Sequence, residues 1–157
     1  MQSVSVNSAK IGAILIDKMM NLNEIVLSKC GISDIKVLAD AMNNQIRSID
    51  LSFNNLECEQ MHQINRILGK NCIKQLSLNH NPIGPLGARV LARGLEGNRS
   101  LLILNLSYCY LQGESSSIFK SLSKHLLIDY LDMSNNYCTD TVIDTVCDML
   151  RTTNSLR

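Results

Sequence analysis

The chain has 157 residues, 45% of them hydrophobic and 18% charged, and its 15 Lys and Arg residues nearly balance its 14 Asp and Glu residues. These values are typical of one globular domain, and the basic residues are scattered along the sequence, which argues against a nucleic-acid partner. The six cysteines form neither a CxxC motif nor a Cys/His spacing that suits zinc. We therefore expect no metal, no cofactor and a reducing compartment.

The N-terminal segment is predicted to be a partial repeat. Residues 6–20, VNSAKIGAILIDKMM, resemble the helix of a repeat whose strand is missing or degenerate. The apolar run 11–16 ends at Asp17, so it is too short for a signal-peptide core or a bilayer span. These features predict a cytoplasmic protein with no membrane partner.

Five copies of one template, L-x-x-L-x-L-x-x-(N/C)-x-L, follow this segment. They are LNEIVLSKCGI (22–32), IRSIDLSFNNL (46–56), IKQLSLNHNPI (73–83), LLILNLSYCYL (101–111) and IDYLDMSNNYC (128–138). The ninth position recurs at intervals of 24, 27, 28 and 27 residues, and every apolar position is filled except the last, which is Cys138. Regularity of this kind indicates an internal repeat.

Each copy combines two periodicities. Around the fourth and sixth positions apolar residues alternate with polar ones, which predicts a short strand with one buried face. The segment after each template has helical spacing, as in Leu86, Val90, Leu91 and Leu95, and there Gly97 supplies a stop signal. Parallel strands joined by helices predict an α/β solenoid, with the sheet on the concave face and the helices on the convex face.

The repeat boundaries follow from the template. We expect a single domain over 1–157, built of a partial repeat 1–21, repeats 22–45, 46–72, 73–100, 101–127 and 128–155, and the start of a further repeat at 156–157. The short first interval predicts a trimmed helix after Cys30, and the Ser-rich segment 113–125 predicts a weak helix. An uncapped solenoid end exposes apolar surface, so we expect further repeats, a partner or self-association there.

The template resembles that of leucine-rich-repeat proteins, specifically the ribonuclease-inhibitor-like class. The resemblance extends over residues 22–156 and is closest in 76–107, at Gly84, Gly87, Ala88, Leu91, Ala92, Leu95 and Asn98. It implies the solenoid fold and leaves the function open, because one fold hosts many functions.

The ninth position is expected to form a structural ladder. An inward-pointing Asn amide can pair with backbone groups in the turn that leaves the strand, and a buried amide needs such partners. Cysteines at the same position are interpreted as small fillers and not as reactive thiols. The ladder residues are Cys30, Asn54, Asn81, Cys109 and Asn136.

The outward residues of neighbouring strands should form columns about 4.8 Å apart on the concave face. The eighth position places Phe53, His80 and Tyr108 on three successive strands, and exposed aromatics on a concave surface are typical of protein-binding hot spots. An equally simple alternative is that these rings stack only to cover the adjacent turn. The partner-binding candidates are Phe53, His80, Tyr108, Tyr130, Asp50, Asn105, Asp132 and Ile103.

Catalysis is a weak hypothesis for this surface, and no catalytic residues are predicted. Ser77, His80 and Asp50 share the face, but an open sheet lacks the enclosure that excludes water and tunes a pKa. The leading hypothesis is therefore a non-enzymatic scaffold that binds a partner protein. Alternatives are a regulator resembling Ran GTPase-activating protein, or a structural or sensor segment of a larger cytoskeletal, ciliary or immune-receptor assembly.

Overall fold

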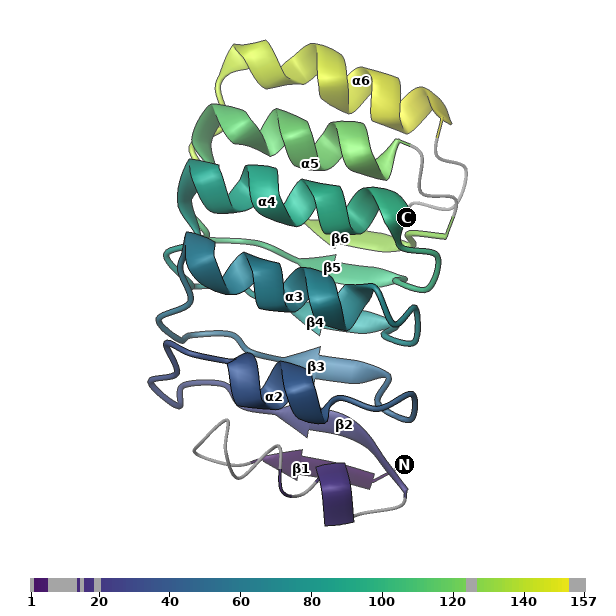
Figure 1. Ribbon diagram of the computed structural model, residues 1–157. Helices are drawn as coiled ribbons and strands as arrows, with labels where there is room; N and C mark the ends of the chain where they lie inside the picture. Colours follow the sequence, from purple (N-terminus) through teal and green to yellow (C-terminus); the bar gives the residue numbers. More distant parts are fainter. Residues whose placement is uncertain (1, 6–13, 15, 19–20, 124–126, 153–157) are drawn as a thin grey trace.

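The computed structural model describes residues 2–5, 14, 16–18, 21–123 and 127–152. Its six strands form one parallel sheet in chain order, and the helices form a second layer on one face of it (Figure 1). The strands are β1 (Gln2–Ser5), β2 (Leu22–Val26), β3 (Ser48–Asp50), β4 (Gln75–Ser77), β5 (Ile103–Asn105) and β6 (Tyr130–Asp132). The helices are α2 (Lys36–Ala41), α3 (Met61–Leu68), α4 (Gly84–Gly97), α5 (Ser115–Leu122) and α6 (Ile143–Thr152). The prediction of an α/β solenoid is confirmed.

The strand register aligns equivalent template positions. Ile49 pairs with Leu76, Leu76 with Leu104, and Leu104 with Leu131. Fourth- and sixth-position side chains therefore stack in continuous rows between the sheet and the helices, and in the first four repeats they are buried. Because each apolar side chain is covered partly by the next repeat, the core is shared along the whole array.

The trimmed first helix is confirmed, since α2 has six residues and α4 has fourteen. The strand of the partial N-terminal repeat is present as β1 and is degenerate, since it lacks the template and its register with β2 shifts between Gln2 and Ser3; most of the helix expected over 6–20 lies outside the described residues. One expectation needs correction, namely that Leu86 belongs to the apolar face of its helix. Leu86 is 63% exposed, because it lies in the first turn of α4 on the side away from the sheet.

The last repeat is the least covered part of the described core. Leu131 and Met133 are only half-buried, whereas the equivalent side chains of the other repeats are buried. A cleft of about 420 Å³ opens here, lined mainly by the segment after β6 and by α6, with Met133, Val146 and, from α5, Phe119 among its apolar residues. Apolar surface is thus available at this end of the sheet.

Three ladder asparagines connect successive repeats through their side-chain amides. Asn81 Oδ1 accepts a hydrogen bond from Leu56 N at 3.0 Å, and its Nδ2 donates to Leu51 O at 2.9 Å and to Leu78 O at 2.8 Å. Asn54, one repeat before Asn81, and Asn136, two repeats after it, make the same set of bonds. Each amide thereby closes the turn of its own repeat and the turn of the repeat before it.

Cys109 occupies the same position with different chemistry. Its buried thiol donates to Leu78 O at 3.2 Å, and its sulfur is a weaker acceptor for the backbone N–H groups of the preceding turn than an amide oxygen is. Ile83 N accordingly donates to Asn81 O within its own repeat, at 2.8 Å. Burial raises the pKa of the Cys109 thiol to about 12, so the side chain is a protonated filler at neutral pH.

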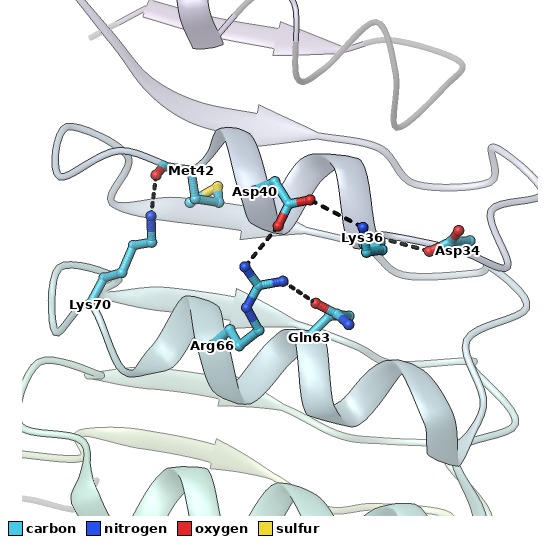
Figure 2. A network of polar contacts seen from close by, with 7 residues as sticks. All are labelled: Asp34, Lys36, Asp40, Met42, Gln63, Arg66 and Lys70. Atoms are coloured by element: carbon cyan, nitrogen blue, oxygen red, sulfur yellow. Dashed lines mark hydrogen bonds and ion pairs between the residues drawn. The ribbon is translucent and has the colours of Figure 1, made fainter.

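Polar contacts also join neighbouring helices on the outer surface. Arg66 of α3 bonds Asp40 of α2 at 2.7 Å and Gln63 at 2.7 Å through its two terminal nitrogens, and Lys70 Nζ donates to Met42 O (Figure 2). The hydrogen bond from Arg66 is the largest cause of the lowered pKa of Asp40. These exposed pairs contribute little stability individually, but they favour one relative position of the two helices.

The helices α3 and α4 pack closely because α4 has a glycine at the contact. A Cβ on Gly94 would lie 2.0 Å from Asn65 Oδ1 and 2.4 Å from Asn65 Cγ. The Asn65 side chain is fixed by its bond from Nδ2 to Val90 O at 2.8 Å, so it cannot move aside without breaking that bond. Gly97 in the same helix has open space at its Cβ position.

We predict that Asn81→Ala lowers the free energy of unfolding by about 3 kcal/mol, since three buried backbone groups lose a partner. Cys109→Ala, at the same position of the next repeat, should cost about 1 kcal/mol because the hydrogen bonds of a thiol are weaker than those of an amide. Urea unfolding followed by circular dichroism measures both values. Equal losses for the two variants would contradict the role assigned to the amide.

A second prediction concerns the helix contact. Gly94→Ala should destabilise the protein by about 1–3 kcal/mol through overpacking against Asn65. Gly97→Ala should leave stability unchanged or raise it by up to about 1 kcal/mol, because alanine is the better helix former. Thermal melting of the two single variants compares them directly, and a stable Gly94→Ala protein would show that the contact is loose.

Candidate functional site

Phe53, His80 and Tyr108 form a stack of rings beside the ends of three neighbouring strands, which we call the aromatic column. The ring centroids are 4.0 Å apart for Phe53 and His80 and 4.2 Å apart for His80 and Tyr108, with interplanar angles of 24° and 16°. Backbone bonds continue past the strands to these residues, from Phe53 N to Asn79 O and from His80 N to Ser107 O. The rings therefore repeat at nearly the spacing of the strands.

The backbone explains why these rings lie outside the core. Every eighth-position residue is left-handed, with φ between 54° and 57° at Lys29, Phe53, His80, Tyr108 and Asn135. In an uninterrupted strand the eighth side chain would point inward and the ninth outward, because successive side chains alternate. One left-handed residue reverses that phase, so the ladder side chain enters the core and the ring remains outside.

The rings of the aromatic column are exposed at their edges, and Lys29 covers the Phe53 end of the stack. Phe53 is 42% exposed and Tyr108 45%, although their faces are partly covered by the stack. Lys29 Nζ lies 4.9 Å from the centroid of the Phe53 ring, which is a cation–π distance. The surface offered to a partner consists mainly of ring edges.

The polar candidates Asp50, Asn105 and Asp132 are half-buried and already take part in local structure. Each accepts a hydrogen bond from the backbone N–H two residues later, at Ser52 (2.8 Å), Ser107 (3.0 Å) and Ser134 (3.0 Å). The side-chain oxygen thus stabilises the exit from the strand. This role is typical of Asp and Asn side chains in turns, which bond the backbone two residues on.

The remaining candidates lie one column away. Ile103 is half-buried and pairs in register with Tyr130, which is 49% exposed. The Ser77 hydroxyl donates to Asn79 Oδ1 and not to the His80 ring. In the described part of the chain, no group of three His, Cys, Asp or Glu residues is placed to hold a metal ion.

A second aromatic pair was not predicted. Tyr110 and Tyr137, which we call the tyrosine pair, have ring centroids 6.3 Å apart and an interplanar angle of 22°. They are 53% and 71% exposed, in the loops that follow β5 and β6. Both occupy the tenth template position, so comparison of that column across the repeats would have found them.

Among the residues described here, no helix is long and apolar enough to cross a membrane.

The outer surface is polar between α4 and α5. There Arg89 bonds Glu114 at 2.6 Å, and this contact, with a hydrogen bond from Ser117, lowers the pKa of the Glu114 carboxyl. The inner face remains the surface on which exposed aromatic side chains gather.

Comparisons with known proteins agree with this architecture. Two leucine-rich-repeat family models match the chain, one over residues 69–92 and one over residues 100–122. A search of curated protein sequences found no match.

Solved structures match most of the chain. One is the actin-binding site 2 of leiomodin-1, with a TM-score of 0.75, 16% identity, and coverage of 90% of this chain and 87% of that one. Another is the tropomodulin C-terminal domain from Caenorhabditis elegans, with a TM-score of 0.75, 11% identity and 92% coverage of both chains. At such identities the likeness establishes the fold. The two family-model matches, the repeated template and the parallel sheet together show that the chain contains leucine-rich repeats.

Proposed function

We propose that this domain is a non-enzymatic scaffold that binds a partner protein through its inner face, centred on the aromatic column. The observation that carries the proposal is the exposure of scarce aromatic side chains. The chain has two Phe and four Tyr residues and no Trp; five of these six are exposed, and three of the five, Phe53, Tyr108 and Tyr130, lie on the inner face. Exposed aromatic clusters are the usual centres of protein–protein interfaces.

The stack supports this function because it restricts the rings before a partner arrives. Each ring is held by its neighbour at about 4 Å and by backbone bonds to the next repeat. Side chains that are already ordered lose less conformational entropy on binding, and more of the contact energy then appears as affinity.

The surroundings of the column also suit a protein partner. Seventh-position serines such as Ser52 and Ser107 form a low floor beside the rings and are themselves buried. A partner side chain or backbone segment can therefore contact the ring edges without a steric barrier. In this proposal Asp50, Asn105, Asp132, Ile103 and Tyr130 flank the contact.

A cytoskeletal role is the second candidate. It is supported by the match, over 90% of this chain, to the leiomodin-1 segment known as actin-binding site 2. Co-sedimentation with filamentous actin tests this role directly, and a domain that stays in the supernatant at every actin concentration would exclude it. The GTPase-activating alternative, the ribonuclease-inhibitor-like class, the cytoplasmic location and self-association through the open end stay predictions.

We predict that Phe53→Asn combined with Tyr108→Asn weakens binding to a partner identified by affinity purification by about 100-fold. Asparagine is chosen because Asn135 occupies the same position with the same left-handed backbone. The thermal midpoint should therefore be retained. Calorimetric titration of the purified partner provides the measurement.

The matched control is Leu86→Ala, which removes an exposed apolar side chain from the outer surface. It should leave partner affinity unchanged. If the double variant bound as tightly as the original protein, or lost stability without losing affinity, the rings would only cover the turn.

A further inference from the structure

The tyrosine pair lies at a position where the backbone favours glycine. Tyr110 and Tyr137 have φ of 57° and 54°, and Gly31, at the same template position of the first repeat, has φ of 64°. A Cβ on Gly31 would meet no atom within 4 Å, so a side chain at this position of that repeat contacts no core. Glycine adopts such a backbone without steric cost, whereas the side chain of tyrosine makes the same backbone strained. Stability alone does not account for tyrosine at these two positions.

The two rings add apolar surface at the edge of the sheet where the strands end. Both are more exposed than the rings of the aromatic column, and their centroid distance of 6.3 Å leaves the ring faces less covered than in the column. Accessible tyrosine faces attract ammonium and guanidinium groups through the ring quadrupole.

The same edge is mainly acidic. The segments between the eighth template position and the next α-helix comprise residues 30–35, 54–60, 81–83, 109–114 and 136–142, all within the described chain. They contain five carboxylates and no Lys or Arg; the carboxylates are those of Asp34, Glu57, Glu59, Glu114 and Asp140. Three cations lie beside these segments: Lys29 precedes the first, Lys36 begins α2, and Arg89 pairs with Glu114. The opposite edge, where the helices end, carries Arg47, Lys70, Lys74 and Arg99 together with Glu96 and Asp129.

This polarity arises because every repeat runs in the same direction. The N-termini of the helices therefore share one edge, and acidic residues are favoured there, whereas basic residues are favoured at the C-termini. Glu57, for example, forms a capping box with Gln60, and Arg99 donates to Glu96 O at 3.0 Å. Local capping preferences add up to an acidic edge and a basic edge, although the charges look scattered in the sequence.

We propose that the tyrosine pair and the acidic edge around it dock a basic, Arg- or Lys-containing segment of a partner protein. Guanidinium or ammonium groups would contact the faces of Tyr110 and Tyr137, with Asp140 supplying the nearest carboxylate along the chain. The inference extends the proposed protein-binding function to a second surface and names its chemistry. It does not depend on the aromatic column.

The test uses an eight-residue peptide of alternating arginine and glycine, with a glutamate–glycine peptide as the control. Because the chain has four Tyr and no Trp, tyrosine fluorescence reports on binding. The arginine peptide should bind saturably and more weakly as salt rises, and the glutamate peptide should give no change. Tyr110→Gly with Tyr137→Gly should weaken arginine-peptide binding, measured by calorimetry, about tenfold.

Stability separates a docking role from a structural one. The glycine variant should melt at the same temperature as the original protein or higher, because its backbone strain is relieved. A lower melting temperature, unchanged peptide affinity or equal binding of the glutamate peptide would each overturn the inference. The variant with Phe53→Asn and Tyr108→Asn should still bind the arginine peptide. Loss of peptide binding at the tyrosine pair can therefore be distinguished from loss of partner binding at the aromatic column.

Discussion

The structure depends on a reversal of side-chain phase at the end of every strand. Asn54, Asn81 and Asn136 must point inward to bond the turns of two repeats, and this requires the preceding residue to be left-handed. That residue is excluded from the core by the same geometry. The ladder therefore fixes the backbone of the eighth position but does not restrict which side chain occupies it. This explains why Lys29, aromatic residues and Asn135 occur there on the same backbone.

Repetition turns such local features into molecular surfaces. A single ring at one eighth position would form no surface by itself. The backbone bonds between repeats place the next ring about 4 Å away and so produce a stack. Capping charges behave in the same way, since parallel helices collect carboxylates at one edge and cations at the other. The buried apolar rows stabilise the fold. The aromatic column and the acidic edge consist of residues outside these rows, where packing does not restrict the choice of side chain.

The periodic features could be predicted from the sequence because each depends on spacing alone. The rows through Ile49, Leu76 and Leu104 and the column of Phe53, His80 and Tyr108 follow from template positions. Features that depend on conformation could not be predicted in this way. A left-handed backbone has no sequence signature when Phe or Tyr adopts it. The exposure of Leu86 depends on where α4 begins, and β1 does not contain the template. The local bonds of Asp50 and Asp132 were predictable from Asx chemistry, which spacing does not reveal.

The most direct test of the central claim is cross-saturation NMR on the complex with an identified partner protein. Irradiating the partner should attenuate the ring signals of Phe53, His80 and Tyr108, while the methyl signals of Leu86 on the outer surface keep their intensity. Attenuation confined to Leu86 and its neighbours on the helices, with the column rings unaffected, would contradict the account.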